Sequence, residues 1–423
     1  MRLSFNQPDS GRSIAKLIFA TLRGIFKTLR LSLPKIGVGW MFALLTIDFN
    51  RIAIVELNVV AVAVTAMLGL HYLLSPFQVI TGRFADQHPI FGLRRTPYLL
   101  IGAVIASAIF LVLPSAAHAM GEGDLSAYAL GFGLLAMYGV GIAMFGDSHH
   151  ALIAESTRPQ SRGGIMAVVQ TVAIMSSIFA AVLMNVVRPE YSPEAMQTLY
   201  SLTPFIVLGS AFLGIIGMEK RLTGDALEKS IAEAKAATPP GNPFVSAYKV
   251  LKENPQARAF GLFVFVSIFA IFLQDNILEV FGAEVFGMSV SETTQFQPTW
   301  GGAVLAGMAI MGLISVVSRI TKRRIVIIGA FGTSMGMAIM AYAALTASRE
   351  LVNPALIFMG FFTGFFNVGA LSMMMDMTVE GATGLYIGLW GMAQALGNGA
   401  ASFSSGALHT GLLETELLTP NVA

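Results

Sequence analysis

The 423-residue chain contains no cysteine, and only 12% of its residues are charged. The lack of cysteine excludes disulfide bonds and thiolate metal sites, and it says nothing about compartment. The low charge accompanies 55% hydrophobic residues, a composition that soluble globular domains do not have. A Walker loop, a nucleophile elbow and a dinucleotide fingerprint in a suitable context are also missing. We therefore predict an all-α polytopic membrane protein that is not an enzyme.

Apolar runs of about 20 residues are long enough to cross a bilayer as helices. The chain has eleven of them, and its 43 glycines and 30 phenylalanines suit helices that pack closely in lipid. The predicted spans lie near residues 36–56, 59–81, 97–118, 127–148, 164–187, 199–218, 259–281, 300–318, 325–346, 355–376 and 383–409.

The lysines and arginines indicate the orientation, because short cytoplasmic loops accumulate them. Of the 26 basic residues, 23 lie before the first span or in the loops that join spans 2–3, 4–5, 6–7 and 8–9. Arg188 and Arg349 lie on the opposite side, and Arg51 lies within span 1. We predict a cytoplasmic N-terminus. The net charge of +2 reflects this sidedness and gives no reason to expect nucleic acid as a partner.

Four parts are predicted along the chain. Residues 1–35 form a cytoplasmic amphipathic segment in which apolar and basic residues alternate at helical spacing, as in helices that lie on an anionic membrane surface. This segment is a topogenic anchor or a helix that docks a partner. Residues 36–218 and 259–423 form two transmembrane bundles. Residues 219–258, with a charged helical stretch followed by prolines, form a cytoplasmic linker.

The two predicted bundles share weak internal matches. Asp48 and Asp275 lie 227 residues apart in spans 1 and 7, and the Ile-Gly-Ala sequences at 101–103 and 328–330 have the same offset. Together with the span count, these matches favour two six-helix bundles related by a parallel repeat.

Span 7 carries the most informative sequence, because it places Asp275, Asn276 and Glu279 in an otherwise apolar helix. The run from Gln274 through Glu279 to Gly287, Met288, Ser289, Glu292, Thr293 and Thr294 resembles the hallmark segment of the bacteriochlorophyll delivery family, the PucC and LhaA-type branch of the major facilitator superfamily. The resemblance extends to residues 39–58, with Asn50, Arg51 and Glu56, and to residues 147–164. It implies the major facilitator fold, which normally has twelve helices. The twelfth is therefore absent here, or the sequence stops before it.

The loop between spans 2 and 3, residues 82–102, resembles the signature loop of the same superfamily through Gly82, Asp86, Arg94 and Arg95. Gly82 is expected to allow a close approach of two helices, and Asp86 to pair with the arginines. Two interpretations remain open: a conformational latch between the bundles, and a structural clasp. Neither places this loop against a substrate.

Charges inside a membrane are costly, so they mark partners or pathways. Three roles remain open for the polar residues of spans 1 and 7: a buried network that clamps the bundles, a proton relay, and pigment binding. The residues are Asp48, Asn50, Arg51, Glu56, Gln274, Asp275, Asn276 and Glu279.

His71 is the one histidine near the middle of a span, and it is a packing residue or a magnesium ligand. Span 10 has a run of aromatic residues that includes Phe362 and Phe366, which form a packing surface or hold a macrocycle. No metal site made of protein side chains alone is expected.

The resemblance implies a protein of the photosynthetic inner membrane that binds bacteriochlorophyll or chlorophyll and delivers it to light-harvesting antenna polypeptides. Lipid or carotenoid are further ligands to consider, and the reaction-centre complex and pigment-synthesis enzymes are further partners. The alternatives are a proton-coupled transporter of a small molecule, which would use Asp48, Arg51, Asp275 and Glu279, and a pigment-free assembly scaffold.

Overall fold

The structure, a computed structural model, describes residues 22–74, 76–157, 159–187, 190–237, 252, 255–317, 320–377 and 383–414. In this part of the chain the regular elements are all helices, and each of the eleven predicted spans falls on one to three of them. Eight helices are long and apolar enough to cross a membrane, and Ala61–Leu73 is a shorter apolar helix.

The helices before residue 217 form the N-terminal half, with Leu22–Glu56 as a single long first span. Its elements are α2 (Pro34–Ala43), the π-helical stretches η1 (Leu44–Phe49) and η2 (Ile52–Glu56), α3 (Ala61–Leu73), α4 (Phe77–Gln87), α5 (Thr96–Ala108), η3 (Ile109–Leu111), α6 (Leu113–Gly121), α7 (Leu125–Ser156), α8 (Pro159–Val187), α9 (Pro193–Ser201) and α10 (Thr203–Ile215).

The predicted charged helix of the linker is α11 (Asp225–Ala237). The C-terminal half follows with α13 (Pro255–Asp275), α14 (Leu278–Phe286), α15 (Val290–Thr294), α16 (Phe296–Val317), α17 (Lys322–Leu345), η4 (Arg349–Leu351), α18 (Val352–Met377) and α19 (Thr383–Glu414). The boundaries of the four predicted parts remain predictions.

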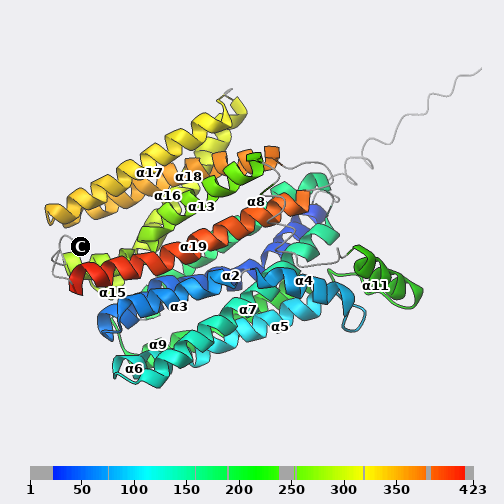
Figure 1. The fold of residues 1–423 in the computed structure, drawn as a ribbon, viewed down its shortest axis with the longest axis horizontal. Coiled ribbons are helices and arrows are strands. Elements are labelled where there is room, and N and C mark those ends of the chain that lie inside the picture. Colours follow the sequence, from blue (N-terminus) through cyan, green and yellow to red (C-terminus); the bar gives the residue numbers. More distant parts are fainter. Residues whose placement is uncertain are drawn as a thin grey trace, which may run out of the picture.

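The two halves lie side by side, with their long helices running in roughly one direction (Figure 1). The blue and cyan helices of the N-terminal half gather on one side, α16, α17 and α18 gather on the other, and α19 runs alongside α3. The helix α11 projects from one end of the molecule, where it packs against α4. We call this end, which also holds Arg94 and Arg95, the basic end.

Small residues set the distance between the halves where α3 and α19 meet. A Cβ atom on Gly69 would lie 3.0 Å from the carbonyl oxygen of Gly399, and one on Gly406 would overlap the hydroxyl of Thr65. Glycine at these positions lets the two backbones approach each other, as in other tightly packed membrane helices.

The predicted amphipathic N-terminal segment is described from Leu22 onward, and there it is helical and continues into α2. Leu22, Ile25, Phe26 and Leu29 expose half or more of their surface. The opposite face is fixed to the rest of the N-terminal half, because Lys27 donates to the carbonyl of Ser156 and Arg30 donates to that of Leu213. The segment therefore presents an apolar stripe outward while its basic residues anchor it.

Candidate functional site

A cavity of about 290 Å³ lies between the two halves. Its walls come from α2, α3 and α7 of the N-terminal half and from α19 of the C-terminal half. The lining combines apolar side chains with an imidazole, two phenols and two amides: Val38, Phe42, His71, Tyr72, Tyr138, Ile142, Ala143, Gly391, Gln394, Ala395 and Asn398. A mostly apolar pocket with a few convergent polar groups is the usual form of a small-molecule site.

His71 is the polar residue that α3 contributes most deeply. Its side chain is buried, and its ring lies 3.9 Å from the ring of Tyr72 and 5.1 Å from that of Tyr138. A Cβ on Gly139 would lie 2.9 Å from the Cα of His71, so this glycine lets α7 approach α3 closely. The Nδ1 atom of His71 has no hydrogen-bond partner among the described residues. The structure therefore places His71 in a cavity wall with hydrogen-bonding capacity to spare.

The polar residues of spans 1 and 7 meet next to this cavity, at irregular backbone. Span 7 is not one continuous helix, because α13 ends at Asp275 and α14 begins at Leu278. The break frees the carbonyl of Asn276, which accepts a hydrogen bond from the side-chain amide of Asn50. The Asn276 side chain donates to the carbonyl of Phe272, one turn earlier.

Arg51 lies between η1 and η2 and joins the halves. Its guanidinium forms an ion pair with Glu56 at 2.5 Å and donates to the carbonyl oxygen of Met288 at 3.3 Å. Glu279 is also buried and interacts electrostatically with both Arg51 and Asp275, while its Oε2 has no hydrogen-bond partner in the described part of the chain.

Asp275 connects this network to the cavity, since it is half-buried and close enough to Tyr72 to interact with it electrostatically. Asp48 is buried within η1, and Gln274 donates to the sulfur of Met359 at 3.0 Å. The structure thus brings the predicted residues of spans 1 and 7 to one region, and it places Asp275 and Glu279 on two helices rather than on one helix face.

Phe362 and Phe366 do not line this cavity. They lie on α18 where it packs against two glycines of α17, since a Cβ on Gly332 would overlap the ring of Phe362 and one on Gly329 would overlap the backbone of Phe366. These two aromatic residues belong to a contact between helices of one half, which matches the packing interpretation.

The predicted latch loop is a compact set of ion pairs at the basic end. Arg95 pairs with Asp86 at 2.5 Å and with Glu155 at 2.8 Å, and Arg94 pairs with Glu155 at 3.3 Å. Gly82 lies against Asp147, where a Cβ would come within 2.6 Å of the carboxylate. Burial lowers the pKa of Arg95, but the attraction and hydrogen bond of Glu155, and the attraction of Asp86, outweigh it and leave the pKa raised.

Glu219 ties the same loop to the linker. Its carboxylate accepts from the backbone N–H groups of Arg94, Arg95 and Thr96 at 2.6 to 2.9 Å, which neutralises the N-terminal end of α5. Arg94 also donates to Ser230 on α11 at 3.1 Å. The printed sequence carries no obvious sign of this contact. Among the described residues, the polar partners of the loop lie in the N-terminal half and the linker, which favours the structural clasp.

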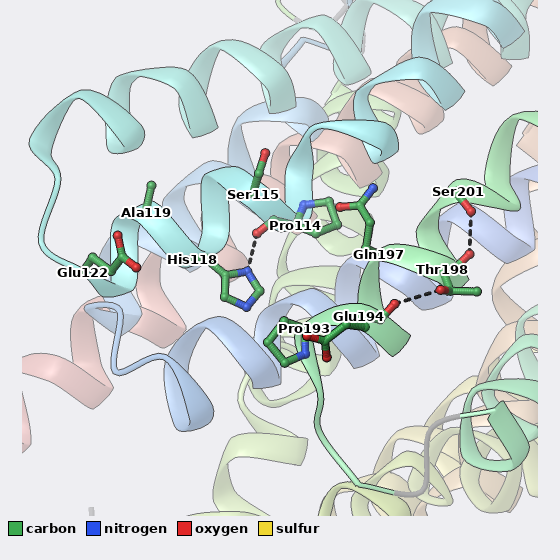
Figure 2. A pocket seen from close by; sticks show the side chains of 10 residues that line it. All are labelled: Pro114, Ser115, His118, Ala119, Glu122, Pro193, Glu194, Gln197, Thr198 and Ser201. Atoms are coloured by element: carbon green, nitrogen blue, oxygen red, sulfur yellow. Dashed lines mark hydrogen bonds between the residues drawn. The ribbon is translucent and has the colours of Figure 1, made fainter.

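A larger and more open cavity of about 700 Å³ lies elsewhere, between α6 and α9 (Figure 2). His118 and Glu194 line it, and His118 bonds to the carbonyl of Pro114 and to the hydroxyl of Tyr191. It contains none of the residues singled out from the sequence and lies within a single half. The smaller cavity is the better candidate because it lies between the halves and adjoins the network of spans 1 and 7.

Four polar residues that line the candidate cavity are not among the residues predicted from the sequence: Tyr72, Tyr138, Gln394 and Asn398. Gln394 and Asn398 lie four residues apart on α19 and therefore on one helix face, and Tyr138 lies on α7. Two polar residues at this spacing in an apolar helix could indicate a polar helix face, but they belong to no recognisable motif.

Comparison with known proteins adds two kinds of similarity. The profile of the PUCC protein family matches residues 48–416. The chain is 31% identical over 384 residues to the "Bacteriochlorophyll synthase 44.5 kDa chain" of Rhodobacter capsulatus, covering 89% of this chain and 85% of that protein. It is 26% identical over 388 residues to "Protein PucC" of Rhodovulum sulfidophilum, covering 88% and 83%.

Solved structures show the fold. A D-xylose-proton symporter superposes with a TM-score of 0.66 at 16% identity, covering 94% of this chain and 95% of that one. The nucleoside transporter NupG superposes with a TM-score of 0.68 at 13% identity, covering 94% and 93%. These likenesses confirm the predicted major facilitator fold.

Proposed function

The chain belongs to the PUCC protein family, a branch of the major facilitator superfamily, and we propose that it binds bacteriochlorophyll or chlorophyll and delivers it to light-harvesting antenna polypeptides. The observation that carries this proposal is the family match over residues 48–416, which includes α3, α7 and α19 of the candidate cavity and leaves out α2 and most of η1. The relative named as a bacteriochlorophyll synthase chain supports the proposal that the bound molecule is a pigment of this kind. The membrane would be the photosynthetic inner membrane, and the protein would act as an assembly factor rather than as an enzyme.

His71 is the residue that fits this cargo best. The magnesium of a chlorin takes an axial ligand from an imidazole, and His71 lines the cavity with a ring nitrogen that no described residue occupies. The rings of Tyr72 and Tyr138 beside it offer flat surfaces for a macrocycle.

The size of the cavity bears on how such a cargo would enter. At about 290 Å³ it lies at the lower end of small-molecule pockets, which span roughly 300 to 1,000 Å³. A whole pigment therefore needs the halves to separate, or needs its hydrocarbon tail to extend between helices into lipid. Lateral entry from the bilayer would make transport across the membrane unnecessary.

A second candidate is a proton-coupled transporter of a small molecule. The half-buried Asp275, between the cavity and the buried Glu279, favours it, because intramembrane carboxylates serve in proton relays. It predicts pH-driven flux in vesicles, which Asp275→Asn abolishes.

The test is to purify the chain from its native membrane in mild detergent and to record its visible and near-infrared spectrum, with bound pigments and proteins identified by mass spectrometry. We expect stoichiometric pigment together with antenna subunits. His71→Leu should remove the pigment, whereas His88→Leu, which changes an exposed histidine in the 2–3 loop, should retain it. A colourless wild-type protein with antenna attached would indicate a scaffold, and a protein with neither would favour the transporter.

A further inference from the structure

Three nitrogen-bearing side chains gather toward the basic end of the candidate cavity. Lys35 on α2 exposes only 9% of its surface, and His149 on α7 is fully buried. His150, the next residue on α7, is exposed and so opens the group to its surroundings. We call these three residues the Lys35 cluster.

Hydrogen bonding, ring stacking and electrostatic interactions hold the cluster together. The Nε2 atom of His149 bonds to the carbonyl oxygen of Leu31 at 2.7 Å, and Leu31 lies one helical turn before Lys35. The rings of His149 and His150 are stacked, with their centroids 6.1 Å apart. Lys35 is close enough to both histidines to interact with them electrostatically. The Nδ1 atom of His149 is buried and has no hydrogen-bond partner in the described part of the chain.

Lys35 and His150 lie on helix faces that also line the cavity, but nearer the basic end. Residues seven apart on a helix lie on nearly the same face, about 10 Å apart along its axis. Lys35 is seven residues before Phe42, and His150 is seven residues after Ala143. Phe42 and Ala143 both line the cavity. Because α2 and α7 run in opposite directions, Lys35 and His150 both lie nearer the basic end than the cavity residues seven positions away. The cluster is therefore about two helical turns from the cavity, toward the basic end.

The charge of Lys35 is not balanced by a carboxylate in the described structure. None of the ion pairs between described residues involves it, and none of the three side chains has an acidic residue among its electrostatic neighbours. Asp147, which precedes the histidines, turns its carboxylate toward Gly82 of α4 instead. A buried cation without a counter-ion is costly, and an anion bound beside it removes that cost.

We propose that Lys35, His149 and His150 form an oxyanion subsite, which holds the carboxylate or phosphate end of an amphipathic ligand whose apolar body lies in the cavity above. The assignment of the apolar body to the cavity rests on the proposed function, whereas the oxyanion subsite itself does not. Bacteriochlorophyll and chlorophyll carry an esterified propionate, so among chlorins the subsite would hold a free-acid form such as chlorophyllide and not the esterified cargo proposed above. For a phospholipid, it selects an anionic headgroup.

The first arm of the test uses two chlorins that differ only at the carboxylate, chlorophyllide and its methyl ester, added to protein purified in detergent. We expect the wild type to bind the free acid about tenfold more tightly than the ester, the ratio that one charge-assisted hydrogen bond supplies. Lys35→Gln should abolish this preference, and Lys35→Arg should keep part of it. Lys229→Gln, which changes a lysine on the exposed face of α11, should behave as the wild type.

The second arm identifies a lipid source. In nanodiscs, stabilisation against heat by phosphatidylglycerol relative to phosphatidylcholine should depend on Lys35 if a lipid phosphate fills the subsite. Dependence on Lys35 in either arm supports the oxyanion subsite and names its ligand. A Lys35→Gln protein that keeps the wild-type preferences in both arms overturns it. A wild-type protein that carries no bacteriochlorophyll or chlorophyll when purified from its native membrane overturns the proposed function, while the lipid arm still tests the subsite.

Discussion

At the scale of single residues, the residues of the family hallmark, which begins in span 7 and continues after it, have two different structural roles. Asn276 and Glu279 take part in the buried network, whereas Ser289 and Glu292 cap a short helix. The backbone N–H of Ser289 donates to Glu292 at 2.9 Å, and the Ser289 hydroxyl accepts from the backbone of Glu292, which together form a capping box for α15. The sequence contains the Ser-x-x-Glu spacing that predicts such a cap.

Glu292 gives a prediction for pH dependence. Its pKa is lowered, first by the backbone hydrogen bond from Ser289 and further by the Ser289 hydroxyl and by Arg349, and these effects together outweigh the opposing effect of burial. A group whose folded pKa is depressed contributes stability above its unfolded pKa, about 4.3 for a glutamate, and loses it as the pH falls through the folded value.

We expect Glu292→Gln to lower the thermal unfolding midpoint at pH 7 by a small amount, because the side chain is nearly half exposed. The gap from the wild type should persist at pH 5 and close as the pH falls below about 4.3. The measurement is thermal unfolding in detergent followed by tryptophan fluorescence. A gap of the same size at every pH would mean that the charge of Glu292 plays no part.

The contacts of Arg51 favour one of the three roles considered for the charges inside the membrane. Each end of its guanidinium has a fixed partner, Glu56 on its own span and the Met288 carbonyl on the other half. A planar guanidinium suits such a two-sided contact better than an ammonium does. This arrangement favours the clamp for Arg51 and leaves Asp275, on the cavity side, as the group suited to proton or ligand binding.

At the scale of elements, the sequence predicted the helices and missed their interruptions. The structure has helices at all eleven predicted spans, and eight of the described helices are long and apolar enough to cross a membrane. Burying backbone groups in lipid forces an apolar stretch of this length to be helical. The π-helical stretches around Asn50 and the break after Asp275 have no such signature, since neither glycine nor proline marks them. Both fall beside the functional charges, where π-helical turns are often found.

The cavity wall was only partly predictable for a related reason. His71 stood out as a lone imidazole in an apolar run, but the contribution of Tyr138, Gln394 and Asn398 depends on how α7 and α19 are rotated against α3. That rotation is set by glycine contacts between distant parts of the chain, such as Gly69 with Gly399. The two interpretations of the aromatic run of span 10 could not be separated from the sequence for the same reason, because the glycines that it packs against lie on α17.

The contact between α17 and α18 gives a prediction at this scale. In Gly332→Ala, the new methyl group would overlap the ring of Phe362, and overpacking of this kind costs about 1 to 3 kcal/mol. We expect a lower thermal unfolding midpoint with pigment binding retained, since neither residue lines the cavity. Gly302→Ala on α16 is the matched control, because a Cβ there meets nothing within 4 Å. Equal midpoints for the two variants would show that α17 and α18 do not pack as closely as described.

At the scale of the whole molecule, the contacts described between the halves run from the cavity toward the end opposite the basic one. Asn50 bonds to Asn276, Arg51 bonds to Met288, and the backbone N–H of Val62 donates to the hydroxyl of Thr410 at 3.2 Å. Val62 is at the start of α3 and Thr410 is near the end of α19, so this last contact joins the two halves farthest from the basic loops.

This contact makes it possible to distinguish two routes by which a cargo could be released. If the halves must rock apart at the end opposite the basic one, holding Val62 to Thr410 blocks release. If cargo leaves sideways into the bilayer or toward the basic end, the same restraint has little effect. Because the natural chain has no cysteine, a cysteine pair at these two positions can be oxidised without competing thiols.

We predict that the Val62→Cys/Thr410→Cys protein, once oxidised, still releases chlorin to an acceptor such as apo-antenna polypeptide in liposomes, at a rate within about twofold of its reduced form. The reason is physical: a large apolar pigment gains nothing from an aqueous exit and is most stable when it passes directly into lipid. Each single-cysteine variant controls for the substitution, and a reductant controls for the bond. Release that stops on oxidation and resumes on reduction would instead show that the two halves rock apart at this end, as a transporter with alternating access requires.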